Sequence, residues 1–532
     1  MLFARIGKVL AGAQNAGFCS HAVTPNAGYL PRRTIENLAV TQDQNTDSPP
    51  PLPPAAGFLR RQGWPLGGLL LLLLLGAGYQ IADEVQTSQF QARHLASYAA
   101  GLNFNVVNGA SDAVRFPAHG PFDQRMGYAE LPRIIERLGT RGYTLAQQAR
   151  FSDALMEYTG RGLFAPYHEK TRAGLDVDDC RGQTLYRFRY PYRGYDDFAA
   201  VPPRVAQALM FIENRDLLDE SRPMMNPAVD WVRFTRAVLG RIGHMVSDDF
   251  DAPGGSTLAT QIEKFRHSPD GVTHNAREKL RQMMSASVRA YQDGEQTLPA
   301  RRRLLLDYLN TVPLSAAPGH GEVNGLGDGL WVWFAADFSE TNALLASADA
   351  SGPKLAAQGR ALHQVVALMI AHRRPSFYLS GGGRQRLAQL SESYLRLLAE
   401  NGVISPLLRD AALSEPLKFR DMTANPALLP ADVGKGATAI RNRLAGMFDA
   451  SLYELDRFDA DVATTLNGAL QKDVSEFLGR LSDPEFARKQ GLLGDRMLVP
   501  AKLGAVRYSF NLVESTSSGN RVRVQTDTTD QP

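Results

Sequence analysis

The residues with the clearest chemical potential are an acidic residue and a glycine-led polar segment that follows it. Glu213 ends the apolar stretch 208–212, and the segment 254–264 comes later in the chain. Partial burial among apolar residues raises the pKa of a carboxylate, which suits a general base. Glycines followed by hydroxyl residues bring hydrogen-bond donors close to an anion. Together the two segments predict a base beside an anion site, although each alone also fits an ordinary helix residue or helix cap.

The expected anion-binding residues come from this segment and from a basic helix start. The first group is Gly254, Gly255, Ser256, Thr257, Gln261 and Lys264. Gln261 and Lys264 are three residues apart, so they share one helix face. The second group is Arg277, Lys279 and Arg281. Cations at a helix N-terminus oppose the helix dipole, so we expect an anionic partner such as a diphosphate, with an exposed basic turn as the alternative.

Composition excludes several classes of function. The chain has 532 residues, enough for two or three domains. Its formal net charge of +3, without an arginine- and aromatic-rich strand motif, gives no support for nucleic-acid binding. Cys19 and Cys180 are far apart in the sequence, and no Cys/His cluster has metal-ligand spacing.

One strongly apolar run predicts a membrane anchor. Leucines fill positions 69–75, with Trp64 and Tyr79 at the two ends of the run. At about 1.5 Å per residue, a span of roughly 16–19 residues is just enough for one helical crossing. Four arginines precede the run and two acidic residues follow it: Arg32, Arg33, Arg60, Arg61, Asp83 and Glu84. This asymmetry predicts a cytoplasmic N-terminus and an external, periplasmic main part. A cleaved signal peptide is the alternative, but signal peptides lack so long a preceding tail.

The remaining chain predicts a mainly α-helical protein with two less helical flanks. A helix is expected at 129–138, a strand at 185–190, a strand–helix unit at 459–481 and β-rich segments within 497–525. The predicted organisation is a proline-rich cytoplasmic tail (1–63), an anchor (64–82), a small α/β lead-in module (83–195), a helical domain (196–415) and an incomplete β-rich segment (416–532). Within the helical part, Trp231, Phe234, Val238 and Ile242 form one stripe, which fits either a core helix or a helix resting on lipid headgroups.

The order of motifs resembles the family 51 glycosyltransferases, the peptidoglycan-polymerising half of class A penicillin-binding proteins. The resemblance covers about residues 196–413. The matching positions, in order, are Glu213-Asn214 with Leu217 and Glu220, Gly254 to Lys264, Glu278 to Gln282, Tyr308-Leu309-Asn310, Gly319 to Phe334, Pro375-Ser376 and Asn401 to Ser405. More weakly, residues 462–471 resemble the linker strand that opens the transpeptidase half of those proteins.

Several positions depart from the family pattern. Asn214, Leu217 and Glu220 replace the family's Asp, Phe and His, and Gln282 replaces a second catalytic Glu. No penicillin-reactive triad is visible. Residues 351–354 fit Ser-x-x-Lys only formally, because we expect Gly-Pro to break the helix that this motif needs.

The resemblance implies a lysozyme-like helical domain that joins lipid II into β-1,4-linked glycan strands and releases undecaprenyl diphosphate. Glu213 would be the general base and Gln282 a weakened second catalytic position, with Asn310 added to the substrate-binding residues above. A divalent cation (Mg²⁺ or Mn²⁺) can assist the leaving diphosphate, although the sequence shows no ligand set for it. The implied partners are lipid II, the growing glycan strand and the bacterial inner membrane. Two alternatives stay open: a non-catalytic scaffold for other cell-wall synthesis proteins, and a lytic glycan-cleaving enzyme.

Overall fold

A computed structural model describes residues 58–117, 120–231, 256–422, 434–517 and 519–529. Three parts of the sequence analysis lie outside these residues: most of the proline-rich tail, the glycine pair Gly254 and Gly255, and the stripe formed by Phe234, Val238 and Ile242. The described parts are mainly helical, as the sequence predicts.

Helix α1 (Phe58–Thr87) carries the apolar run, and the boundary between the two compact units of the chain falls within it, after Asp83. Leu71, Leu72, Leu73, Leu74 and Leu75 are each between 58% and 68% exposed. Across the residues that the structure describes, no helix is both long and apolar enough to cross a membrane. The predicted anchor is therefore not confirmed.

The lead-in module is an α/β structure, as expected. Its elements are α2 (Gln89–Gly101), β1 (Phe104–Asn108), α3 (Pro121–Arg125), α4 (Leu131–Gly139), β2 (Gln147–Phe151), α5 (Asp153–Gly160), β3 (Ala173–Asp178) and β4 (Thr184–Tyr190). Helix α4 and strand β4 confirm the helix and the strand predicted here. Strands β1 and β2 pair antiparallel, and β3 pairs antiparallel with β4.

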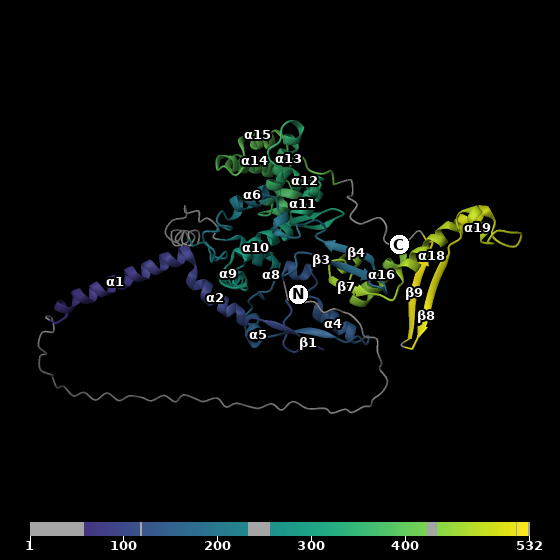
Figure 1. The fold of residues 1–532 in the computed structure, drawn as a ribbon, viewed down its shortest axis with the longest axis horizontal. Helices are drawn as coiled ribbons and strands as arrows, with labels where there is room; N and C mark the ends of the chain where they lie inside the picture. The colour runs from purple at the N-terminus through teal and green to yellow at the C-terminus, as the bar shows by residue number, and fades with distance from the viewer. Residues whose placement is uncertain (1–57, 118–119, 232–255, 423–433, 518, 530–532) are drawn as a thin grey trace, which may run out of the picture. The chain divides into compact units, whose positions relative to one another are not determined.

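The sheet of the lead-in module is completed from the other end of the chain (Figure 1). Strand β7 (Asp459–Ala463) pairs in parallel with β3, so the sheet order is β4-β3-β7. Leu175, Val177 and Tyr186 pack on one face of this sheet against Leu444 and Phe448 of helix α16 (Lys435–Phe448). The sequence predicts β7 as a strand, but its partner is more than two hundred residues away.

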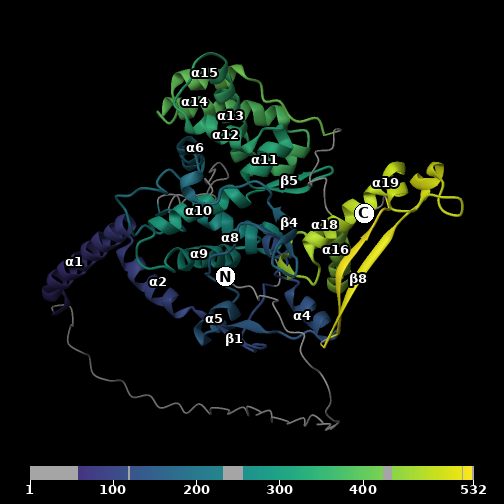
Figure 2. The same ribbon diagram turned by 45° about the vertical axis from the view of Figure 1, so that its right-hand side comes forward.

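The helical domain is built around helix α13 (Gly352–Ala371), whose central residues are almost all buried. The other elements are η1 (Phe198–Ala200), α6 (Pro203–Glu213), α8 (Leu258–His267), η2 (Pro269–Gly271), α9 (Ala276–Ala290), α10 (Leu298–Thr311), α11 (Gly325–Phe334), α12 (Phe338–Ala346), η3 (Ser376–Ser380), α14 (Arg384–Glu400) and α15 (Pro406–Ser414). Figure 2 shows α14 and α15 beside α13, in line with the close packing of α13 on both.

Two local features differ from the sequence expectations. A short hairpin, β5 (Pro313–Ala317) and β6 (Gly321–Asn324), interrupts the helices. Gly352 and Pro353 do not break a helix but begin α13, with Ser351 at its N-cap, because proline is tolerated in the first turn, where no helical hydrogen bond is lost.

The C-terminal segment contains the strand–helix unit and the β-rich stretches that the sequence predicts. Helix α17 (Leu452–Leu455) precedes β7, and α18 (Gly468–Arg480) follows it. Then come α19 (Pro484–Lys489), η4 (Pro500–Ala505) and the antiparallel pair β8 (Ser509–Thr516) and β9 (Gly519–Asp527). Helix α18 packs against β9.

Candidate active site

Glu213 is the last residue of α6 and is buried at 7% exposure. The helix places it there because Val205, Ala208 and Leu209 form an apolar face that packs into the core of the helical domain. Gln261, on α8, donates a hydrogen bond from Nε2 to Glu213 Oε2 at 2.9 Å. The two motifs that the sequence analysis paired are therefore in direct contact.

Two further residues beside Glu213 were missed by the sequence analysis. Arg373 Nη2 lies 3.4 Å from Glu213 Oε1, and His372 Nε2 lies 3.8 Å from the same oxygen and 3.2 Å from Gln261 Oε1. Burial lowers the pKa of His372 despite the nearby Glu213 carboxylate. Both residues follow α13 and precede Pro375-Ser376, which served only as a family landmark. The Pro375-Ser376 motif could thus have pointed to these two residues, but nothing in the sequence shows that the end of α13 lies beside Glu213.

Thr257, one of the predicted substrate-binding residues, caps the start of helix α8. Thr257 is the N-cap residue, and its hydroxyl accepts a hydrogen bond from the backbone N–H of Thr260, while Thr260 Oγ1 accepts one from the backbone N–H of Thr257. This reciprocal pair fixes the direction of the helix. Thr257 is buried at 2% exposure, so its side chain stabilises α8.

Two lysines on neighbouring helices form the cationic side of the site. Lys279 Nζ, from α9, donates to Ser256 Oγ at 2.8 Å and to Thr260 Oγ1 at 3.2 Å. Burial, together with the charge of Lys264, lowers the pKa of Lys279 to about 8. Burial also lowers the pKa of Lys264, against the opposing effect of Glu213. Because burial lowers the pKa of both lysines, an anion entering here would meet two partly desolvated cations.

The remaining predicted site residues lie elsewhere. Asn310 is buried and makes two hydrogen bonds to the backbone of Tyr195. Its Nδ2 donates to Tyr195 O at 2.8 Å, and its Oδ1 accepts from Tyr195 N at 2.9 Å. Arg277 is exposed on the first turn of α9, where Asn275 caps the helix and Glu278 is the acidic residue of the turn. Arg281 lines a different cavity, beside Gly162 of the lead-in module.

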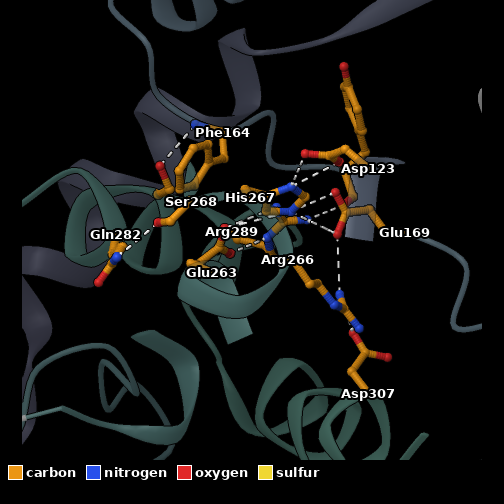
Figure 3. Close-up of polar contacts among 12 residues, drawn as sticks. Asp123, Phe164, Glu169, Glu263, Arg266, His267, Ser268, Gln282, Arg289 and Asp307 are labelled. Atoms are coloured by element: carbon orange, nitrogen blue, oxygen red, sulfur yellow. Dashed lines mark hydrogen bonds and ion pairs between the residues drawn. The ribbon is translucent and has the colours of Figure 1, made fainter. Parts of the chain in front are cut away.

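Gln282 is fully buried and has hydrogen-bond partners of its own. Its Nε2 donates to Ser268 Oγ and to Thr273 Oγ1, each at 2.9 Å. No contact between Gln282 and Glu213 occurs in the described part of the chain. These contacts make Gln282 a link between α9 and the loop after α8 (Figure 3).

A comparison with protein-family models finds one match. Residues 181–389 match the model described as transglycosylase. This segment is a transglycosylase-family domain. The match begins in the turn before β4 and ends within α14, so it contains Glu213, Gln261, both lysines, His372 and Arg373. No curated protein matches the chain.

A buried charge network joins the lead-in module to the helices of the transglycosylase domain (Figure 3). His267, at the end of α8, has Nδ1 at 3.1 Å from Asp123 Oδ2 and Nε2 at 2.9 Å from Glu169 Oε1. Arg266 pairs with Glu169 at 3.2 Å and with Asp307 at 3.4 Å. Burial alone would lower the pKa of His267, but the two carboxylates raise it to about 10. The two carboxylates thus favour the protonated form of this buried imidazole.

The same network contains a group of side chains of the types that can bind a metal ion. Asp123, Glu169 and His267 have ligand atoms within 4.8 Å of one another. Each imidazole nitrogen faces a carboxylate, however, so these side chains already partner one another within the protein. Arg266 also forms an ion pair with Glu169. Beside Glu213 the described neighbours are Gln261, His372 and Arg373, a set that does not suit Mg²⁺ or Mn²⁺.

Proposed function

We propose that the chain is a peptidoglycan glycosyltransferase that polymerises lipid II into β-1,4-linked glycan strands. The family match supports a transglycosylase context. The observation that carries the proposal is a buried carboxylate, Glu213, held by Gln261 close to two lysines with lowered pKa. A base beside an anion site is the arrangement that glycosyl transfer from a diphosphate requires.

In the proposed reaction Glu213 accepts the proton of the acceptor sugar's 4-hydroxyl. The freed oxygen attacks C1 of the donor sugar from the face opposite the diphosphate, so the configuration inverts. A C1–O4 bond forms, and the bond from C1 to the diphosphate oxygen breaks, with the electron pair leaving on undecaprenyl diphosphate. Lys264 and Lys279 neutralise the charge that develops on this leaving group. Arg373 and Gln261 keep the carboxylate of Glu213 in place.

A scaffold without catalytic activity is the second candidate, and one observation favours it. The position where the family has a second acidic residue is Gln282, whose amide is committed to Ser268 and Thr273. A lytic enzyme is less consistent with the site, because hydrolysis of a glycan uses a pair of carboxylates at the scissile bond and needs no cationic diphosphate site. Among the described residues around Glu213, the neighbours are an amide, an imidazole and cations.

Turnover of lipid-linked substrate by the purified full chain separates the three activities. Polymeric glycan from lipid II would support the proposal. Intact lipid II at the end of the reaction would support the scaffold. Shortened strands from preformed glycan would support a lytic enzyme.

We further propose that α1 anchors the protein in the bacterial inner membrane, with the transglycosylase domain in the periplasm. The support is the leucine run 69–75, in which Leu69 and residues 71–75 are exposed, and the excess of arginines before it. A periplasm-dependent reporter fused after Gln86 should be active, and one fused before Ser48 should be inactive. The reverse pattern would overturn both the topology and access to an external substrate.

A further inference from the structure

A second cavity, away from Glu213, lies between the lead-in module and helices α8 and α9. It has a volume of about 700 Å³, within the range of small-molecule sites. Most of its lining comes from the lead-in module, together with His267 at the end of α8 and Arg281 of α9. None of the residues that surround Glu213 lines it. We propose that this cavity binds a small amphiphilic anion, a molecule with one carboxylate or phosphate group on an apolar body.

Two arginines give one side of the cavity its positive charge. Arg115 and Arg281 both line the cavity, and both pack against the short segment 160–162 at the end of α5. A Cβ on Gly160 would lie 3.2 Å from Arg115 Nη2, and a Cβ on Gly162 would lie 3.4 Å from Arg281 Cζ. Among the residues that the structure describes, neither guanidinium forms an ion pair or a hydrogen bond. Like charges held against one segment repel each other, so an anion bound beside them would be stabilised by both.

Both guanidinium groups belong to side chains that keep accessible surface. Arg115 is exposed and Arg281 is half-buried. A guanidinium presents parallel N–H donors that match the oxygens of a carboxylate or a phosphate. The sequence analysis expected Arg281 at the diphosphate beside Glu213. Its position in this separate cavity leaves its charge available for a different anion.

The remaining charges of the lining are already compensated. Asp123 and Glu169 lie on the two sides of His267, and Lys170 pairs with Asp459 at 2.6 Å. The two arginines are therefore the excess charge of the cavity. A further anion beside the carboxylates of Asp123 and Glu169 would be unfavourable. The anionic group of a ligand should accordingly lie at the arginines.

The rest of the lining is mainly apolar. Phe116, Pro117, Leu131, Pro132 and Leu163 line the cavity; four of them are half-buried and Pro132 is exposed, so each keeps surface that a ligand can cover. An inorganic anion would leave this apolar surface in water, and a neutral apolar molecule would leave the two arginines without a counter-charge. A molecule that joins an anionic group to an apolar body satisfies both requirements.

The test is calorimetric titration of the full chain in detergent with matched probes. Hydrocinnamate carries a carboxylate on an apolar body, hydrocinnamide has the same body without charge, and acetate has the charge without the body. We expect hydrocinnamate to bind at least about tenfold more tightly than either of the other two, because it alone uses both the arginines and the apolar lining.

A fourth probe, phenylpropyl phosphate, distinguishes the two kinds of anionic group. Tighter binding of the phosphate than of hydrocinnamate would identify a phosphate ester as the ligand class. Equal or weaker binding would identify a carboxylic acid.

Two variants locate the anionic group. Arg115→Gln and Arg281→Gln should each weaken hydrocinnamate binding by about fivefold or more and leave hydrocinnamide binding unchanged. Arg161→Gln is the matched control: Arg161 lies on the same short segment but outside the cavity lining, where it pairs with Glu157. This variant should bind hydrocinnamate as the wild type does. Thermal unfolding of the three variants checks that each is folded.

Equal affinity for hydrocinnamate and hydrocinnamide, or no binding of either anionic probe, would overturn the proposal. The same weakening by Arg161→Gln as by the two cavity variants would also overturn it, because it would show a general effect of surface charge. None of these measurements depends on glycan polymerisation, so failure of the proposed function would leave their outcome unchanged.

Discussion

Gln261 and Glu213 form the contact that organises the candidate site: the amide nitrogen of Gln261 lies 2.9 Å from Glu213 Oε2. The other end of the same amide faces His372 Nε2 at 3.2 Å. A side chain of α8 is thereby held between the ends of α6 and α13. The candidate base is oriented by its neighbours as well as buried, which is what a preorganised active site requires.

Replacing Gln261 with Leu should lower kcat/KM for lipid II by about tenfold or more, because a hydrogen bond to a charged group contributes roughly 1.5–3 kcal/mol. Gln385→Leu, at an exposed position of α14, is the matched control and should retain full activity. A Gln261→Leu enzyme with normal kcat/KM would show that the carboxylate needs no orientation by the amide.

The activity should also report the titration of Lys279. Its pKa is lowered to about 8, so the ammonium charge is present below that pH and is lost as the pH rises through it. Because kcat/KM reflects the free enzyme, we expect it to fall with an apparent pKa near 8 on the alkaline side. Lys279→Arg should remove this decline, since a guanidinium stays charged. A decline that persists unchanged in Lys279→Arg belongs to another group.

Stability should depend on His267. Its pKa is raised to about 10 from an ordinary 6.5, so its stabilisation is complete below about pH 6.5 and is lost as the pH rises toward 10. His267→Gln leaves the buried Asp123 without its charged partner, while Glu169 keeps Arg266, and should lower the free energy of unfolding by about 3–5 kcal/mol.

Chemical denaturation at pH 6 and pH 9 measures both effects of His267. His168→Gln is the control, because His168 is half-exposed and should change stability by less than about 0.5 kcal/mol. Equal losses in the two variants would contradict the role of the buried network.

Gln282→Glu tests whether this position belongs to the active site. The family pattern alone predicts that a carboxylate here preserves or raises polymerisation. The contacts predict the opposite, because the new charge would be buried and the donor to Ser268 and Thr273 would be lost. We expect the free energy of unfolding at pH 7 to fall by at least about 1–3 kcal/mol, with no gain in turnover. A more active Gln282→Glu enzyme would return this position to the catalytic set.

The sequence predicts the elements better than their partners. Strand β4, helix α4, strand β7 and the β-rich stretches that form β8 and β9 follow from local periodicity. The pairing of β3 with β7 does not, because local pattern carries no information about a strand hundreds of residues away. The sequence predicts that Glu213 lies beside the segment 254–264, but the hydrogen bond from Gln261 to Glu213 is seen only in the structure.

Two of the predicted site residues have structural roles that the sequence does not reveal. Thr257 and Asn310 are polar residues in the right motifs, yet their hydrogen bonds go to the backbone of α8 and of Tyr195. A polar side chain that satisfies the backbone looks the same in a sequence as one that meets a ligand. His372 and Arg373 show the converse, because only the packing of α13 against α6 brings them to Glu213.

The most direct test of the central claim is lipid II turnover by Glu213→Gln beside the wild type and Glu220→Gln. Glu220 is an exposed carboxylate paired with Arg302 on the surface, so its loss should leave the rate unchanged. Gln at position 213 keeps the shape and removes the basicity. We predict a folded enzyme whose polymerisation is slower by about 10²–10⁴-fold. Wild-type turnover by Glu213→Gln, with normal folding, would contradict the account.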